Sequence, residues 1–446
     1  MNVTQTIATF INETRFDDLP ARAVIKAKLA FLDWIGCTLG GSRDRSSLLL
    51  HGALSEFSGP PQATIIGHGE KTDIFSAALL NGYSSHVLDY DDVHMGWIGH
   101  PSITVFPAIT ALSEWRKIRG RDFLTAFVVG VEVESRIGAA VMPTHYDRGW
   151  HSTATIGHFG AAAAAASVLG LDTKAIVNAL GTAGTQAAGL RQMFGTMCKP
   201  LHAGKVAVGG LMAAVLAGRE FTSSSDIIGG SGGFASVFSD DYEPAKLIDK
   251  LGETWEVDSI VFKRHASCYS THALIECALT LSERVRPVLS QVNSIRCKVA
   301  PLAKNIANIG QPQTGLEGKF SQPFCAAVAL TKGKVTEEHF GDEMVSDPVI
   351  RELVGKTSVV ASSALPYGKA VIEVVLNDGR SLDGQIDAIE LGLPPKLLQS
   401  SLSEKFIGLA TRGAPDERID ALIDRVMKMD LTEDVGRVIE LLPSTV

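Results

Sequence analysis

Cysteine is scarce in this chain, and no two cysteines are close enough to form a Cys-x-x-Cys motif. Six cysteines are scattered over 446 residues. A zinc site made of cysteine thiolates needs such close pairs, so the spacing argues against one. Residues 1–20 also lack the cationic and apolar regions of a secretory signal. We therefore expect reduced thiols in a cytoplasmic protein.

Long apolar runs are missing too. Spanning a bilayer takes about 18 apolar residues, whereas the runs at 159–171 and 206–218 end after 13 residues each and are expected to be buried helices. Positive charge is also limited, since 41 lysines and arginines against 49 aspartates and glutamates give a net charge of −8. Phosphate backbones require a basic surface. We expect neither a membrane nor a nucleic acid as a partner.

Phosphate-binding glycine motifs are also lacking. The 43 glycines form neither a Gly-x-Gly-x-x-Gly motif after a strand nor a Gly-x-x-x-x-Gly-Lys-Ser/Thr loop. A bound nucleotide is therefore not implied. Gly209 and Gly210 stand instead inside an apolar helical stretch, where we expect a neighbouring backbone to approach closely.

The remaining composition is that of an ordinary globular chain, with 45% hydrophobic and 20% charged residues. A chain of this length exceeds what one hydrophobic core normally supports, so two domains are expected. Helical spacing of apolar residues dominates the first half and returns near the end, at 21–36, 123–140, 160–169, 204–218, 398–409 and 418–429. The alanine run at 161–166 predicts helices packed closely together.

A β-rich pattern separates these helical parts. Its segments are 292–300, 356–362, 369–376 and, after an Asp-Gly turn at 378–379, 381–386. The alternation of apolar and polar residues predicts strands, and the Asp-Gly turn predicts a hairpin. We therefore predict a mostly α fold. Its large all-helical domain is formed by residues 1–266 and 405–446, and a smaller α+β domain, residues 267–404, is inserted between them.

Titratable side chains are most crowded between Leu88 and Pro101. Three carboxylates and two imidazoles fall within twelve residues there: Asp89, Asp91, Asp92, His94 and His100. Burying so many is costly unless they pair with each other or with a ligand. Carboxylates beside imidazoles are typical of proton-transfer sites. The alternatives for the aspartates are helix capping and a structural ion-pair network.

Cations and histidines recur near the starts of predicted helices in the rest of the chain. The segments are Arg148–Thr155, Lys199–Lys205, Lys263–His272 and Glu317–Ser321. The free N–H groups and partial positive charge of a helix N-terminus suit an anionic ligand. Gathered in one pocket, these groups would suit a small polycarboxylate. Dispersed, they would be surface lysines and ordinary buried histidines.

A metal site is a competing interpretation of the crowded segment. His86-x-x-Asp89-x-Asp91-Asp92-x-His94 holds many ligand types, but its spacing matches neither His-Glu-x-x-His nor an EF-hand loop. We therefore predict no metal, and we interpret His86 and His94 as ordinary polar positions. Arg191 is either an ion-pair partner or a bidentate ligand for a carboxylate.

The order of these motifs resembles the MmgE/PrpD family over roughly residues 5–440. The motifs are Leu-Asp-Tyr-Asp-Asp-Val-His at 88–94, Gly-His-Pro-Ser at 99–102, Arg-Gly-Trp-His-Ser-Thr-Ala-Thr-Ile-Gly at 148–157, Lys-Pro-Leu-His-Ala-Gly at 199–204, Phe-Lys-Arg at 262–264 and Gly-Lys-Phe-Ser at 318–321. The resemblance implies a large helical domain with a smaller α+β domain, a homodimer, no required cofactor and a small polycarboxylate substrate.

The same resemblance implies a catalytic set made of Asp89, His100, His151, Lys199 and Lys263. Removing a proton next to a carboxylate builds negative charge, which the lysines would stabilise. The two histidines would act as acid and base, and Asp89 would orient one of them. The substrate-binding candidates are Thr155, Arg191, His202, Cys268 and His272.

The family includes 2-methylcitrate dehydratase, cis-aconitate decarboxylase and iminodisuccinate epimerase. Val93 stands where the decarboxylases have a threonine, and Cys268 stands where they have a histidine. The residues of these motifs and the compact length of the chain are more similar to those of iminodisuccinate epimerase. We therefore expect an isomerase that epimerises iminodisuccinate. A dehydratase- or decarboxylase-type lyase is the alternative, and a non-catalytic binding or scaffold protein is a remote one.

Overall fold

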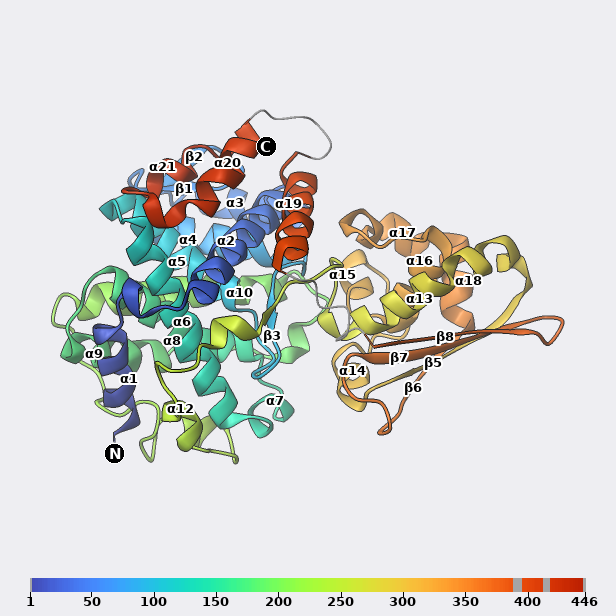
Figure 1. Cartoon of the computed structure of the whole chain (residues 1–446), viewed down its shortest axis with the longest axis horizontal. Helices are drawn as coiled ribbons and strands as arrows, with labels where there is room; N and C mark the ends of the chain where they lie inside the picture. Colours follow the sequence, from blue (N-terminus) through green and yellow to red (C-terminus); the bar gives the residue numbers. More distant parts are fainter. Residues whose placement is uncertain (1, 388–394, 412–417, 444–446) are drawn as a thin grey trace.

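Long apolar helices pack against one another to form the larger part of the molecule (Figure 1). The structure is a computed structural model and describes residues 2–387, 395–411 and 418–443. The main helices up to residue 217 are α1 (Val3–Glu13), α2 (Ala21–Gly41), α3 (Arg45–Ser55), α4 (Ile74–Val87), α5 (Pro101–Arg116), α6 (Gly120–Val141), α8 (Ser152–Val168), α9 (Thr173–Gly184) and α10 (Cys198–Ala217). Short elements join them: β1 (Ala63–Ile65), β2 (Glu70–Thr72), α7 (Thr144–Asp147), α11 (Phe234–Phe238) and α12 (Ala245–Ile248).

Small residues let the central helices approach closely. The alanines at 161–166 of α8 are all fully buried. Gly210 of α10 lies so near α8 that a Cβ atom there would be 2.5 Å from the backbone nitrogen of Ala162. The predicted close approach of a backbone is thus confirmed at Gly210, whereas Gly209 faces the side chain of His158.

One described helix, α10, is long and apolar enough to cross a membrane by length and composition. It packs against α4 and α8, and 67% of its apolar 18-residue stretch is buried inside the protein. Such burial is typical of the core helix of a domain. The expected buried helices at 159–171 and 206–218 correspond to α8 and α10.

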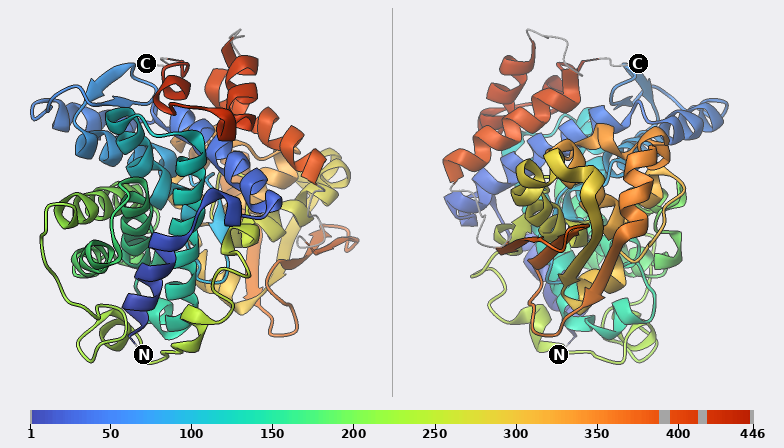
Figure 2. Two further views of the ribbon diagram at one scale, coloured as in Figure 1. Left: turned by 60° about the vertical axis from the view of Figure 1, so that its left-hand side comes forward. Right: turned by 90° about the vertical axis from the view of Figure 1, so that its right-hand side faces the viewer.

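The end of the chain returns to the larger part. α19 (Pro395–Thr411) and α20 (Arg418–Met427) pack against α2, and α21 (Gly436–Ile439) packs against α5 (Figure 2). Phe406 of α19 is fully buried, and Gly36 of α2 leaves room for its ring. The predicted domain boundary between residues 404 and 405 falls inside α19.

A four-stranded sheet with helices on one face forms the smaller part (Figure 1). The strand order is β6 (Thr357–Ala361), β5 (Val292–Val299), β7 (Lys369–Leu376), β8 (Ser381–Asp387), with β5 and β6 parallel and the other pairs antiparallel. The helices are α13 (His272–Val285), α14 (Pro301–Ile306), α15 (Gly315–Gly318), α16 (Gln322–Lys332), α17 (Asp342–Ser346) and α18 (Pro348–Lys356). Alternate residues of β7 are buried, as in a sheet with one covered face. The predicted hairpin is confirmed as β7–β8, and the predicted mostly α fold with a smaller α+β part is confirmed as well.

The crowded segment between α4 and α5 lies where the two parts meet. Its strand β3 (Val93–His94) pairs with β4 (Ile260–Val261), just before the smaller part begins. Tyr90 packs against the core of the smaller part, and its hydroxyl donates a hydrogen bond of 3.1 Å to the backbone oxygen of Arg264. The fold therefore holds residues 89–100 between its two cores.

Candidate active site

A cavity at this junction is lined by side chains from both parts. Its empty space, which includes open solvent at its mouth, is about 410 Å³. The larger part contributes Asp89, Val93, Met95, Ile98, His100, Tyr146, His151, Phe194 and Lys199; the smaller part contributes Cys268, Tyr269, Ser270, Ile306, Phe320 and Tyr367. Four of the five predicted catalytic residues thus lie around one space, together with Cys268.

Asp89 is the centre of the charged side of the cavity. Its backbone has a positive φ of 51°, which is uncommon outside glycine. Its Oδ1 accepts hydrogen bonds from the ammonium groups of Lys199 (2.9 Å) and Lys263 (2.7 Å), and its backbone oxygen accepts another from Lys263 (2.9 Å). Burial alone would raise the pKa of Asp89, but the two ammonium charges outweigh burial and hold it well below its usual range.

Positive charge exceeds negative charge here. A third buried lysine, Lys319, donates to the backbone oxygens of Leu88 (2.7 Å) and Ala266 (2.8 Å). Burial lowers the pKa of Lys319 to about 8, so most of it is protonated at neutral pH. Lys199, Lys263 and Lys319 therefore outnumber the ionised carboxylates of Asp89 and Asp91. Such an excess attracts an anionic ligand.

Lys405 of α19 stabilises this arrangement from the far end of the chain. Its ammonium nitrogen lies 2.6 Å from Oδ1 of Asp33 and donates to the backbone oxygens of Tyr90 (2.6 Å) and Lys263 (3.3 Å). It also lies 3.9 Å from the centre of the Tyr90 ring. One side chain thus fixes the backbone on both sides of the Asp89–Lys263 contact.

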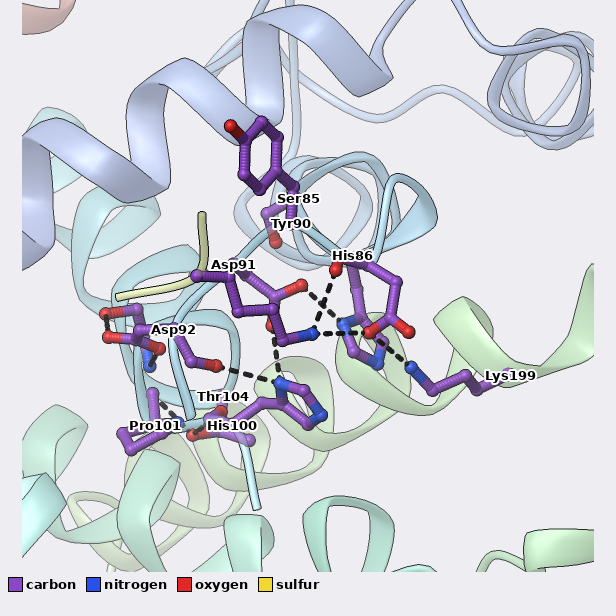
Figure 3. Close-up of polar contacts among 12 residues, drawn as sticks. Ser85, His86, Tyr90, Asp91, Asp92, His100, Pro101, Thr104 and Lys199 are labelled. Carbon is purple, nitrogen blue, oxygen red and sulfur yellow. Dashed lines mark hydrogen bonds and ion pairs between the residues drawn. The ribbon is translucent and has the colours of Figure 1, made fainter. Parts of the chain in front are cut away.

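Asp91 lies between two imidazoles (Figure 3). Its Oδ1 accepts a hydrogen bond of 2.9 Å from Nδ1 of His86, and its Oδ2 lies 2.8 Å from Nδ1 of His100. The backbone oxygen of Asp92 is also 2.8 Å from Nδ1 of His100. Because both neighbours can only accept hydrogen bonds, Nδ1 of His100 carries the proton. The lone pair is therefore on Nε2, the other ring nitrogen.

Both of these imidazoles are neutral. Burial lowers the pKa of His86 to about 3, although Asp91 opposes the shift. Burial lowers the pKa of His100 as well and again outweighs the carboxylate of Asp91. The rings pack edge to face with their centroids 4.6 Å apart. His100 is thus a neutral base on the cavity wall, with its tautomer set by hydrogen bonding.

His151 supplies another neutral imidazole. It directly precedes α8, as predicted. Its Nδ1 lies 2.9 Å from Nδ1 of His202 on α10, and Phe194 packs edge-on against its ring at 5.1 Å between centroids. Burial, His202 and Lys199 hold the pKa of His151 well below its usual range. The cavity therefore has two candidate proton-transfer groups, His100 and His151.

Asp92 is a buried carboxyl group whose pKa is raised, in contrast to those of Asp89 and Asp91. Its Oδ1 accepts a hydrogen bond from the backbone nitrogen of Ser102 (3.1 Å), and its Oδ2 accepts one from the Ser102 hydroxyl (2.5 Å). Burial raises the pKa of Asp92 to about 7, more than these hydrogen bonds lower it. Asp92 thus fixes the start of α5, next to His100, and exchanges a proton near neutral pH.

Two predicted substrate-binding residues lie behind the cavity wall. The Thr155 hydroxyl is engaged by Nε2 of His145 at 2.8 Å. Arg191 stacks on Tyr146, with its guanidinium carbon 3.9 Å from the ring centre, and donates to the backbone oxygen of Tyr146 (3.0 Å). Their contact with substrate stays a prediction; in the structure they support residues that surround the cavity.

His202, His272 and Lys263 are also set back from the cavity. His202 meets His151, and Nε2 of His272 lies 3.2 Å from the backbone oxygen of His265. Lys263 is fully buried against Asp89. The assigned roles of these residues stay predictions, and direct contact with a ligand would require the cavity to widen.

Several residues of the site were not predicted. His86 was interpreted as an ordinary polar position, yet it is 1% exposed and hydrogen-bonded to Asp91. The only indication of this contact in the sequence is that His86 lies five residues before Asp91. By contrast, Nε2 of His94 lies 3.0 Å from Oε2 of Glu256, in a separate contact. No local signal indicated Tyr367, whose hydroxyl lies 2.9 Å from that of Ser270 on the cavity wall.

The site contains donor atoms that could in principle hold a metal. Atoms of His86, Asp89, Asp91 and His100 lie within 4.8 Å of one another. However, Oδ1 of Asp89 already accepts two ammonium groups, and both oxygens of Asp91 face ring nitrogens that carry protons. A metal ion bound through these oxygens would have to displace the protons, and any cation there would lie beside the ammonium groups of Lys199 and Lys263. This positive charge disfavours a resident metal ion.

Comparison with known proteins identifies similar sequences over nearly the whole chain. Profiles of the MmgE/PrpD N-terminal and C-terminal domains match residues 5–246 and 265–429. The cis-aconitate decarboxylase-like protein oryM of Aspergillus oryzae is 28% identical, over 99% of this chain and 97% of the relative. Cis-aconitate decarboxylase of Homo sapiens is 27% identical, over 99% and 94%. The mitochondrial 2-methylcitrate dehydratase of Yarrowia lipolytica is 23% identical, over 97% and 89%.

Replacement of Asp89 by asparagine tests the charged centre. Asp89→Asn leaves Lys199 and Lys263 buried without their counter-charge, so we expect the free energy of unfolding to fall by about 3–5 kcal/mol. The matched control is Asp258→Asn, which removes the partner of the exposed Arg22 and should cost about 1 kcal/mol or less. Urea unfolding at neutral pH measures both. Equal, small losses in the two variants would contradict the assignment.

Replacement of Asp92 by asparagine tests its raised pKa. The pKa of Asp92 is about 7 in the folded protein against an ordinary value of 3.8. A raised folded pKa contributes stability that is complete below about pH 4 and is lost as the pH rises to about 7. Asparagine is neutral throughout and can keep both contacts with Ser102. We therefore expect Asp92→Asn to gain stability relative to wild type, by a few kcal/mol, between about pH 4 and pH 8.

Urea unfolding of wild type and Asp92→Asn at several pH values in this range checks the expectation. A stability difference that does not change with pH would show that Asp92 titrates normally.

Proposed function

The chain belongs to the MmgE/PrpD family, and from this premise we propose that it is a lyase that acts on a small di- or tricarboxylate without a cofactor. The relatives named cis-aconitate decarboxylase and 2-methylcitrate dehydratase support a lyase over the epimerase expected from the motifs. The reaction class is proton transfer at a carbon next to a carboxylate. The homodimer, the cytoplasmic location and the absence of membrane and nucleic-acid partners stay predictions.

The observation that carries the proposal is the neutral imidazole of His100 beside an ammonium-rich wall. Its Nδ1 proton is held by Asp91 and Asp92, so the lone pair is on Nε2, and His100 lines the cavity. Lys199 lines the same cavity. A carboxylate bound to Lys199 would place its neighbouring carbon within reach of a base, and the surrounding positive charge would stabilise the negative charge that develops.

In a dehydration, His100 takes a proton from the carbon next to a carboxylate. The electron pair of that C–H bond forms the double bond while the C–O bond on the adjacent carbon breaks. The hydroxyl group leaves as water after taking a proton from an acid, for which His151 is the candidate. In a decarboxylation, the bond to one carboxylate breaks, carbon dioxide leaves, and the acid supplies a proton to the electron pair that remains on carbon.

Epimerisation of iminodisuccinate is the second candidate, and two features of the cavity favour it. His100 and His151 both line the cavity and both are neutral, as expected where one group removes a proton and another returns it to the opposite face. Val93 and Cys268, the departures from the decarboxylase pattern, also line the cavity. An apolar group and a thiol there change the surface that a substrate meets.

A substrate panel in deuterated water tests the proposal. We expect a hydroxy-tricarboxylate such as 2-methylcitrate to give a new alkene signal by NMR, or cis-aconitate to lose carbon dioxide. Deuterium entry next to a carboxylate of iminodisuccinate, with an unchanged skeleton, would instead establish the epimerase. Conversion of none of these acids would overturn the enzyme proposal in favour of a binding protein.

Replacement of His100 by glutamine tests the base. On the substrate that the panel identifies, His100→Gln should lower kcat by about 10²–10⁴-fold, because a general base is lost. The matched control is His94→Gln, a buried histidine of the same segment that pairs with Glu256 outside the cavity. It should retain kcat within a few-fold. Near-wild-type activity of a folded His100→Gln protein would remove His100 from the reaction.

A further inference from the structure

His202 lies next to His151, which belongs to the cavity wall. Nδ1 of His202 lies 2.9 Å from Nδ1 of His151, and the ring centroids are 5.1 Å apart. His151 lines the cavity and is 2% exposed. His202 is not among the lining residues and is partly exposed. The pair therefore leads from the cavity wall toward a solvent-accessible ring.

Only one proton can lie between the two Nδ1 atoms. Burial lowers the pKa of His202 to about 4 and, with its neighbours, holds that of His151 well below its usual range. Both rings are thus neutral at rest, and each carries one N–H group. If the shared proton belongs to His151, its Nε2 has a lone pair and is a base. If it belongs to His202, Nε2 of His151 carries the proton and is an acid.

We propose that His151 and His202 form a two-imidazole proton relay between the cavity and solvent, an inference that rests on the proposed function and deepens it. When Nε2 of His151 takes a proton from substrate, its Nδ1 proton passes to Nδ1 of His202, and the Nε2 proton of His202 leaves to water. The reverse sequence starts with a proton from water on Nε2 of His202 and ends with the acid form of His151. Each pass breaks as many N–H bonds as it forms, and both rings end neutral.

The residues around His151 and His202 position the two rings and disfavour a lasting positive charge on His151. The backbone nitrogen of His151 donates to the backbone oxygen of Gly189 at 3.0 Å. A Cβ atom at Gly189 would lie 3.3 Å from Nε2 of His202, so a side chain at this position would crowd that nitrogen. Lys199, His86 and His100 are the other titratable groups that act on His151, and all of them disfavour a lasting positive charge on its ring. The pair is therefore suited to transferring a proton, and neither ring is suited to remaining positively charged.

His202→Gln tests the relay, because an amide fills similar space but cannot exchange a proton between two ring nitrogens. On the identified substrate we expect kcat to fall by about 10²-fold, the lower end for loss of a proton-transfer group, with KM within twofold of wild type. Free imidazole should restore part of the lost kcat. The matched control is Lys205→Gln, an exposed position one turn further along α10, which should change neither kcat nor the response to imidazole.

A second measurement does not depend on turnover. In protein labelled with ¹⁵N-histidine, the shared proton should give a downfield N–H resonance that is lost in both His202→Gln and His151→Gln and kept in Lys205→Gln. A wild type without that resonance, or a His202→Gln protein whose lost kcat is not raised by imidazole, overturns the relay and leaves the proposed function standing. A wild type that converts no polycarboxylate overturns the proposed function, and the relay with it.

Discussion

Two buried ammonium groups that share one carboxylate oxygen hold this site together. Lys199 comes from α10 of the larger part, and Lys263 comes from the segment that leads into the smaller part; both bind Oδ1 of Asp89. An unpaired ammonium group in this position would cost several kcal/mol to desolvate. The junction is therefore stable only in the arrangement that brings both lysines to Asp89. The same arrangement brings together the side chains of both parts that form the cavity walls.

Charged and neutral groups have different roles in this site. The ammonium groups exceed the ionised carboxylates, so an anion is attracted, while burial keeps His100 and His151 neutral and able to accept or donate a proton. Asp91 shows why both features can coexist: it is ionised and orients His86 and His100 through their Nδ1 atoms, while burial keeps both rings neutral. A site with fewer lysines would hold the same bases but would not favour a polycarboxylate.

Much of the fold could be predicted, because apolar spacing along a helix or strand reports burial locally. The strand expected at 369–376 coincides with β7, and the alanine run lies in the closely packed α8. Within the site, local motifs indicated Asp89, His100, His151 and Lys199. The contacts that give these residues their chemistry join distant parts of the chain, as Lys405 does with Asp33, and no local pattern encodes them. His202 illustrates the limit: the sequence makes it a candidate for substrate binding, and only the packing of α8 on α10 reveals its contact with His151.

The most direct test of the account is a crystal structure with tricarballylate, a saturated tricarboxylate that has no hydroxyl group to lose. The account predicts one carboxylate of the ligand within hydrogen-bond distance of the Lys199 ammonium group. It also predicts the adjacent carbon beside Nε2 of His100, with Lys199 and Lys263 still on Asp89. A ligand bound away from this cavity, or a His100 ring whose Nε2 is turned away from the ligand, would contradict it.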